Sequence, residues 1–397
     1  MWDCIIIGAG PSGLMAGIIA SSNSKTLIIE KNTKPGKKLL LTGNGRSNIT
    51  NLKENNLFLE AITHNKKYLY STINNFGPYD IYNFFIKNNV PLQEEEENKI
   101  FPSSNKASDI LNALIKNTNN IEFKYNETVT HINYHLDNIE VITNHNRYQA
   151  KNIIIATGGA SFKQTGSTGD HMEFAKQLNQ PSINLYPAEV GVILKEKTNL
   201  QGTAFNKVKV TYQNHQVIGK LIYTHKGLSG SAIMALSEYI YQNENKTITI
   251  DFLPDQTIDE LCQVLENYNK DKELVTFLIN YFSKRFSLYL INKIDCPPNT
   301  KIKHLNHKQI TNLVVLIKKF SYQILRVDDL NNAYITGGGI DMKYINSKTM
   351  ESTIKKGVYF VGEALDIHGP IGGYNLTLAL STGYTAGKSI SKTKKDS

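Results

Sequence analysis

The strongest constraint on the fold lies between residues 3 and 30. An apolar run at residues 4–7 leads into the glycine-rich segment 8–13, and an apolar helical segment and a second apolar run follow before Glu30. Strand, turn, helix and strand in this order predict one βαβ unit with two parallel strands. A chain that contains this unit is expected to form an α/β domain of the Rossmann type.

Three glycines at fixed spacing indicate what this unit can bind. Gly8 permits the tight turn after the strand, Gly10 allows close approach by a pyrophosphate, and Gly13 lets the helix pack against the strands. The helix that follows Gly10 presents unpaired N–H groups and a partial positive charge, which stabilise phosphate. The segment therefore predicts a dinucleotide site.

An acidic residue closes the second strand. Glu30 stands where such domains hydrogen-bond the adenosine ribose, and its negative charge disfavours a 2′-phosphate at this position. NAD and FAD both satisfy this half of the pattern. The residues that we expect to contact the dinucleotide here are Gly8, Ala9, Gly10, Pro11, Ser12, Gly13, Glu30 and Lys31.

The C-terminal part of the chain decides between the two cofactors. Residues 357–362 are typical of a buried strand, and the glycine-rich segment 369–375 opens the last helix. A flavin dinucleotide is long, so its ribityl and ring parts need a second set of contacts, and the N–H groups that begin this helix can face the N1/O2 edge of a reduced flavin. We therefore predict FAD, with contacts from Gly362, Glu363, Asp366, Gly373, Asn375 and Leu376.

No second strand–GxGxxG–helix unit occurs in the sequence. The glycines at 227–230 and 337–339 lack a preceding strand and a following helix of the required kind. If NADH or NADPH reduces the flavin, we therefore expect it to bind transiently as a reductant, without a domain of its own.

The length of 397 residues exceeds what one hydrophobic core usually fills, so inserted modules are expected. Short alternating strands from about residue 190 predict an antiparallel module, and a capping box at Thr257 and Glu260 opens a helical stretch with one helix over 274–291. The predicted domains are a discontinuous FAD-binding Rossmann-type domain of residues 1–190 and 332–397, a β-rich inserted domain of residues 191–255 and 312–331, and a helical insert of residues 256–311. The acidic run 94–97 is interpreted as an exposed loop.

Composition points to an ordinary globular protein. The formal net charge is +9, but the lysines are scattered, and the densest basic clusters, 37–38, 318–319 and 392–395, favour plain solvation over a nucleic-acid surface. No nucleic-acid partner is therefore expected. The three cysteines have no metal-binding spacing, no basic leader precedes the first strand, and no apolar run is long enough to span a membrane. We expect a cytoplasmic protein without membrane association or metal, and its oligomeric state is not predicted.

A longer pattern connects these segments to a known family. Residues 36–50, GKKLLLTGNGRSNIT, resemble the GxKxxxSGxGRCNxTN signature of the BaiN-like (YhiN-like) bacterial flavoproteins. Further segments match the family in the same order along essentially the whole chain: 157–159 with 166–170, 224–230, 336–339 and 362–376. The resemblance implies an FAD domain of Rossmann type that is interrupted by a β-rich and a helical module.

The resemblance also implies further cofactor contacts. It places Lys38, Gly43, Arg46 and Asn48 in a loop beside FAD, gives Val129 a backbone contact to adenine, and adds Thr157 and Gly158. Arg46 can bind a phosphate or a substrate carboxylate in bidentate fashion, with a surface salt bridge as the alternative.

Two positions depart from the family pattern. Ser47 replaces the usual cysteine, so a mechanism that needs a thiol at this position is in doubt, and His171 stands where glycine is common. His225 and His368 are the titratable groups expected nearest the flavin ring, although a structural role is favoured for each.

These observations predict an FAD-dependent oxidoreductase that transfers a hydride between flavin and a small organic substrate, with NAD(P)H as one source of electrons. The alternatives are an FAD-containing protein that binds or modifies RNA, a flavoprotein oxidase acting on amines, and a flavoprotein without turnover. The substrate and the catalytic acid or base are not predicted.

Overall fold

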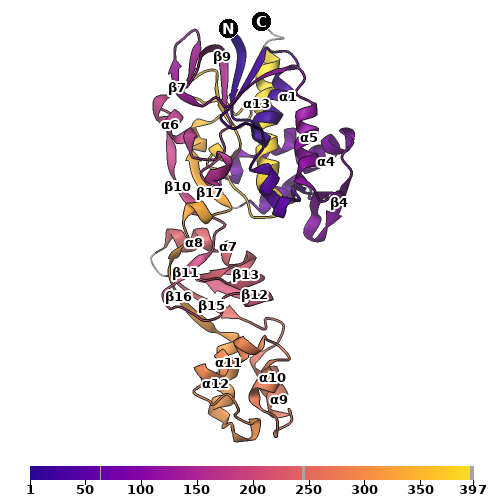
Figure 1. Cartoon of the computed structure of the whole chain (residues 1–397), viewed down its shortest axis with the longest axis vertical. Helices are drawn as coiled ribbons and strands as arrows, with labels where there is room; N and C mark the ends of the chain where they lie inside the picture. The colour runs from indigo at the N-terminus through magenta and orange to yellow at the C-terminus, as the bar shows by residue number, and fades with distance from the viewer. Residues whose placement is uncertain (63, 244–245, 394–397) are drawn as a thin grey trace. The chain divides into compact units, whose positions relative to one another are not determined.

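A computed structural model describes residues 1–62, 64–243 and 246–393. The chain divides into two compact units: unit 1 is Met1–Tyr186 with Tyr334–Ser397, and unit 2 is Pro187–Ala333 (Figure 1). The divisions fall within four residues of the predicted ones, at 186/187 instead of 190/191 and at 333/334 instead of 331/332. Each unit has its own hydrophobic core.

Unit 1 is built on a seven-stranded sheet in which β1 is central. Strand β1 pairs in parallel with β2 and with β9, and Ile7 lies level with Ile29 on one side and Ile155 on the other. The carboxyl ends of these three strands therefore meet at one edge of the sheet. The strands are β1 (Trp2–Ile7), β2 (Thr26–Glu30), β6 (Ile121–Tyr125), β7 (Val129–Tyr134), β8 (Ile139–Thr143), β9 (Arg147–Ile155) and β18 (Val358–Phe360), in the order β6-β2-β1-β9-β8-β7 with β18 also paired to β9.

Helices α1 (Pro11–Ala20) and α13 (Tyr374–Thr393) lie side by side in unit 1 (Figure 1). Two glycines of α13 make this close packing possible. A Cβ atom at Gly383 would lie 2.2 Å from the carbonyl oxygen of Ser12, and one at Gly387 would lie 2.5 Å from that of Ala16. The C-terminal helix therefore supports the helix that follows the glycine motif.

The remaining elements of unit 1 surround this centre. They are α2 (Asn55–Glu60), α3 (Tyr70–Asn75), α4 (Pro78–Lys87), α5 (Ala107–Lys116), α6 (Asp170–Gln177), the antiparallel strands β3 (Thr50–Asn51), β4 (Leu92–Glu95) and β5 (Lys99–Pro102), and the pair β10 (Ser182–Ala188) with β17 (Ile335–Ile340). The acidic run 94–97, which was predicted to be a loop, instead contributes Glu94 and Glu95 to β4, because β5 pairs with it residue by residue.

Unit 2 contains a closed barrel of six strands, where the alternating pattern predicted an antiparallel module. The strands are β11 (Val192–Leu194), β12 (Ala204–Tyr212), β13 (His215–Tyr223), β14 (Gly227–Ser229), β15 (Thr247–Asp251) and β16 (Phe320–Val327), and all their pairings are antiparallel. In β16 buried and exposed residues alternate from Phe320 to Leu325, because successive side chains of a strand point to opposite faces. The α/β fold with an inserted antiparallel module is thereby confirmed.

The helices of unit 2 share one hydrophobic core with the barrel. They are α7 (Ser231–Met234), α8 (Ser237–Gln242), α9 (Ile258–Glu266), α10 (Leu274–Leu278), α11 (Lys284–Lys293) and α12 (His307–Lys318). The ring of Phe286 on α11 lies 4.6 Å from that of Phe252, which directly follows β15, and 4.8 Å from that of Phe205 on β12. These contacts make the helical insert continuous with the barrel core.

Helix boundaries in unit 2 confirm one prediction and correct another. The capping box exists, since Thr257 Oγ1 accepts from Glu260 N at 3.2 Å and the Glu260 carboxylate accepts from Thr257 N at 2.7 Å. The single helix predicted over 274–291 is wrong, because Ser283 is extended and its hydroxyl caps a new helix by accepting from Phe286 N. In the segment 312–331, which was assigned to the β-rich domain, α12 continues to Lys318 and β16 begins at Phe320.

None of the helices formed by the described residues is both long and apolar enough to cross a membrane.

Candidate functional site

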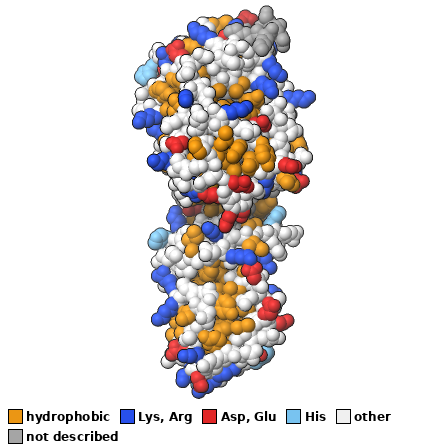
Figure 2. Space-filling model, turned by 90° about the vertical axis from the view of Figure 1, so that its right-hand side faces the viewer, with side chains coloured by type: hydrophobic (Ala, Val, Ile, Leu, Met, Phe, Trp, Pro, Cys, Tyr) orange, Lys and Arg blue, Asp and Glu red, His pale blue; other side chains and the backbone are white. Residues whose placement is uncertain are grey.

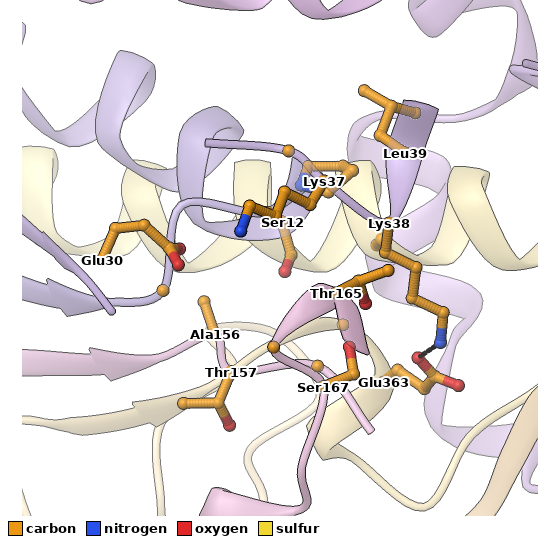
Figure 3. A pocket seen from close by; sticks show the side chains of 18 of the residues that line it. Ser12, Glu30, Lys37, Lys38, Leu39, Ala156, Thr157, Thr165, Ser167 and Glu363 are labelled. Carbon is orange, nitrogen blue, oxygen red and sulfur yellow. Dashed lines mark hydrogen bonds and ion pairs between the residues drawn. The ribbon is translucent and has the colours of Figure 1, made fainter. Parts of the chain in front are cut away.

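A cavity opens in unit 1 where β1, β2 and β9 end (Figure 3). This is where parallel α/β sheets commonly bind ligands, because the turns that follow the strands converge there. Most of the residues predicted to bind the cofactor line it: Gly8, Gly10, Pro11, Ser12, Glu30, Lys31, Lys38, Val129, Thr157, Gly158, Gly362, Glu363, Asn375 and Leu376.

The three motif glycines have different surroundings. Gly8 has φ +104°, and a Cβ atom there would lie 2.6 Å from the carbonyl oxygen of Ala156. A Cβ atom at Gly13 would lie 2.0 Å from the carbonyl oxygen of Gly8. Gly10 differs, because a Cβ atom there would have no protein atom within 4 Å and the residue lines the cavity. Gly8 and Gly13 serve the protein's own packing, whereas Gly10 leaves open space beside the start of α1.

Glu30 organises the turns around the cavity. One of its carboxylate oxygens accepts from the backbone N–H of Ala9 at 2.8 Å, and the other accepts from the backbone and side chain of Asn32 at 2.8 and 2.7 Å. A carboxylate offers about four acceptor positions, so hydrogen bonds to a ribose remain compatible with these contacts. Glu30 therefore fixes the motif turn as well as lining the cavity.

Lys38 and Glu363 form an ion pair on the cavity wall, with Nζ and Oε2 2.7 Å apart (Figure 3). Glu363 also accepts from Thr336 N at 2.9 Å and from Gly159 N at 3.3 Å. Burial alone would raise the pKa of the Glu363 carboxyl, but the ammonium and these N–H groups outweigh burial and hold the pKa below its ordinary value. Glu363 is therefore anionic at neutral pH.

Glu127 supports the segment that carries Val129. Its carboxylate accepts from Thr143 Oγ1 at 2.6 Å, from Asn146 Nδ2 at 3.0 Å and from the hydroxyl of Tyr148 at 3.0 Å. Burial alone would raise the pKa of Glu127, but these hydrogen bonds outweigh burial and lower the pKa. The network holds residues 127–129 against the cavity, where a backbone contact to adenine is predicted for Val129.

Seven predicted site residues do not line the cavity: Ala9, Gly13, Gly43, Arg46, Asn48, Asp366 and Gly373. Arg46 forms an ion pair with Glu95 and lies over the ring of Phe101 at 4.2 Å, which is the salt bridge named above as its alternative. The amide of Asn48, oriented to satisfy its neighbours, accepts from Gly373 N at 3.2 Å. Arg46, Asn48 and Gly373 thereby connect loops that border the cavity.

Asp366 belongs to a histidine cluster beside the cavity. Its carboxylate accepts from Asn65 Nδ2 at 2.9 Å and lies 2.8 Å from His64 Nε2. The ring of His64 stacks on that of His368 with centroids 4.7 Å apart. His225, the other histidine predicted near the ring, is an exposed residue of unit 2. Neither His225 nor His368 lines the cavity.

Several cavity residues escaped the sequence interpretation. Lys37 is one, because the pair 37–38 was interpreted as a solvated cluster although both lysines line the cavity. The acidic residue Glu127 carried no motif. Others are Asn32, Leu39, Thr42, Thr128, Ala156, Thr165 and Ser167. The available signal was that Asn32 and Ala156 lie within two residues of the ends of β2 and β9, which meet at the same edge of the sheet.

His171, the departure from the family pattern, is buried at the start of α6. Burial lowers the pKa of its imidazole to about 4, although the carboxylates of Glu363 and Asp170 oppose this shift. A histidine with a lower pKa in the folded than in the unfolded protein makes the folded state less stable in acid. The unfolded chain takes up a proton near pH 6.5, so the free energy of unfolding falls as the pH drops from about 6.5 to about 4.

We therefore expect His171→Leu to flatten this decline. Between pH 6.5 and 5 the wild type should lose roughly 2 kcal/mol more than the variant, from about 1.4 kcal/mol per pH unit. Urea unfolding at both pH values measures the difference, and His131→Gln, at an exposed position of unit 1, serves as the control. An equal decline in wild type and His171→Leu would contradict the assignment.

Comparisons with known proteins add family context to this geometry. The model of the family described as HI0933-like protein Rossmann domain matches residues 2–389. The chain is 27% identical to a protein of Escherichia coli named ribosomal RNA dihydrouridine synthase, over 98% of both chains. It is 25% identical to a 3-dehydro-bile acid Δ(4,6)-reductase of Clostridium scindens, again over 98% of both chains.

Solved structures show the same fold at lower identity. A 3-ketosteroid Δ4-(5α)-dehydrogenase from Rhodococcus jostii, in complex with 4-androstene-3,17-dione, aligns with 98% of this chain and 96% of its own length. The TM-score is 0.51 and the sequence identity is 12%, so this likeness concerns the fold alone.

Proposed function

We propose, on the premise that the chain belongs to the HI0933-like Rossmann-domain family, that it reduces a carbon–carbon double bond conjugated to a carbonyl group. The chain is an enzyme of the FAD-dependent oxidoreductase class. We propose the type of bond that it reduces, its substrate and its source of electrons.

The observation that carries the cofactor part of the proposal is the extent of the cavity. Its wall contains Glu30 and Val129 at the strand ends, the start of α1, and Asn375 and Leu376 at the start of α13. This arrangement fits a dinucleotide whose two halves contact different helices. Gly10, also on the wall, fits a phosphate there, because a Cβ atom at this position would meet no protein atom within 4 Å.

Bound FAD would supply hydride chemistry, and the residues of this chain would orient it. The N-terminal N–H groups of α1 would bind the diphosphate, and Glu30 would accept from the adenosine ribose. The start of α13 would face the negative edge of the reduced ring. Leu39, Ile367 and Leu376 contribute apolar side chains to the wall, which would exclude water from a bound ring.

The names of the two relatives support the type of bond. Dihydrouridine is uridine whose C5–C6 double bond, conjugated to the C4 carbonyl, is saturated. A Δ(4,6)-reductase of a 3-dehydro-bile acid acts on double bonds conjugated to the C3 ketone. Both names describe reduction of an activated double bond, for which hydride addition to the carbon β to the carbonyl is the shared chemistry.

Uridine in ribosomal RNA is the second candidate substrate beside a small enone. It is favoured by the full-length similarity to the dihydrouridine synthase and by the net charge of +9. Against it, Lys and Arg side chains lie scattered among acidic and apolar ones over the face shown in Figure 2. The expectation of no nucleic-acid partner stays a prediction that the experiment below addresses.

Anaerobic half-reactions test the proposal. The purified protein is reduced with NADH, NADPH or dithionite and then mixed with 4-androstene-3,17-dione or with an unmodified ribosomal RNA transcript. We expect one acceptor to restore the oxidised flavin spectrum and to gain two hydrogens by mass spectrometry. If neither acceptor reoxidised the flavin and only oxygen, added afterwards, did so, the result would contradict the proposal. If dithionite reduced the flavin and NADH and NADPH did not, the nicotinamide cofactors would be excluded as reductants.

A further inference from the structure

Three lysines line the cavity, and they differ in how their charge is compensated. The ammonium of Lys31 lies 2.7 Å from the carboxylate of Asp170, and that of Lys38 lies 2.7 Å from the carboxylate of Glu363. Lys37 instead donates to the amide oxygen of Asn32 at 2.9 Å. Within the described part of the chain no carboxylate forms an ion pair with Lys37.

Lys37 is positioned by a chain of hydrogen bonds that starts at the motif. Glu30 accepts from the side-chain amide of Asn32 at 2.7 Å, which orients the amide oxygen toward Lys37. The lysine side chain is only partly exposed. Figure 3 shows it extended between Glu30 and Ser12, so that its ammonium lies on the same side of the cavity as the start of α1.

A dinucleotide bound in the cavity would need positive charge near its diphosphate, and Lys37 is placed to supply it. A diphosphate carries two negative charges, whereas a helix N-terminus offers only about half of one positive charge. Lys31 and Lys38 are already neutralised by their own carboxylates. A dinucleotide bound at α1 would therefore lack a full counter-charge unless another cation were present.

We infer that the ammonium of Lys37 binds the diphosphate of FAD on the same side of the cavity as the N-terminus of α1. Asn32 and Glu30 are positioning residues for this contact. Glu30 thereby serves the cofactor twice, directly at the ribose and indirectly through the lysine. This inference rests on the proposed function only insofar as the cavity binds FAD, and it is independent of the substrate.

The rate of FAD release from the purified holoprotein tests the inference. It is followed by the rise in flavin fluorescence after dilution, at low and at high salt, for wild type, Lys37→Met, Lys37→Arg and Lys34→Met. Lys34 is an exposed residue of the same loop and serves as the matched control. A charge-assisted hydrogen bond predicts about ten- to hundredfold faster release from Lys37→Met at low salt. Salt screens the contact in the wild type, so the difference should shrink at high salt, and Lys37→Arg should restore slow release.

Three results would overturn the inference. Release from Lys37→Met at the rate of Lys34→Met would show that the lysine does not touch the cofactor. Faster release by the same factor at every salt concentration, or without restoration by Lys37→Arg, would assign Lys37 a packing role instead. Wild-type protein that carries no FAD would refute the proposed cofactor and the inference with it, whereas failure of every substrate would leave the release assay intact.

Discussion

Replacing Gly10 with valine is expected to weaken FAD binding at least about a hundredfold while the fold of unit 1 persists. The backbone at Gly10 has φ −77° and ψ 179°, which any residue adopts, and a Cβ atom there meets no protein atom within 4 Å. The valine side chain would therefore occupy the cavity where the diphosphate approaches α1. Loss of two charge-assisted hydrogen bonds corresponds to roughly 3 kcal/mol or more, about a hundredfold in affinity.

Flavin content and circular dichroism together measure this outcome. Gly10→Val should purify colourless with wild-type secondary structure. Gly13→Ala is the contrasting variant, because its Cβ atom would lie 2.0 Å from the carbonyl oxygen of Gly8 and would push α1 away from the strands. That variant should lose both the cofactor and stability. Full flavin occupancy in Gly10→Val would refute the assignment of the α1 N-terminus to the diphosphate.

The second large effect is expected at Glu363. Glu363→Ala removes the partner of Lys38 and leaves the N–H groups of Thr336 and Gly159 without this acceptor. Breaking a fully buried pair costs about 3 to 5 kcal/mol, but both side chains retain some exposure, 25% for Lys38 and 21% for Glu363. We therefore expect the free energy of unfolding to fall by roughly 2 to 4 kcal/mol and FAD to dissociate faster.

Glu95→Ala is the matched control, since Glu95 also pairs with a basic residue, Arg46, but at a more exposed position outside the cavity. The free energy of unfolding, measured with urea, and the FAD release rate should change little in this variant. The pKa of Glu363 lies below its ordinary value, so the contribution of the pair is present near neutral pH and is lost as the pH falls through that lowered pKa. Equal behaviour of the two variants would refute a cofactor role for Glu363.

Local sequence patterns predicted many of the secondary-structure elements correctly. The βαβ unit, the capping box at Thr257 and the barrel strands all depend on neighbours within a few positions, which a sequence displays directly. The helix predicted over 274–291 failed for a related reason. Apolar spacing continues across Ser283, whereas the structure uses that serine as a cap, and side-chain capping competes with helix continuation at such residues.

The amino-acid sequence by itself determined that this chain has a Rossmann-type domain, that Gly8, Gly10 and Gly13 form the turn from β1 into α1, and that an antiparallel module interrupts the domain. Only the tertiary structure decided what the charged residues do. Lys38 and Glu363 meet across 325 positions of the chain, and the contact that pairs Arg46 with Glu95 spans 49. Charges attract through space and carry no periodic signature, so folding alone selects which cations are neutralised and which, like Lys37, stay open to a ligand.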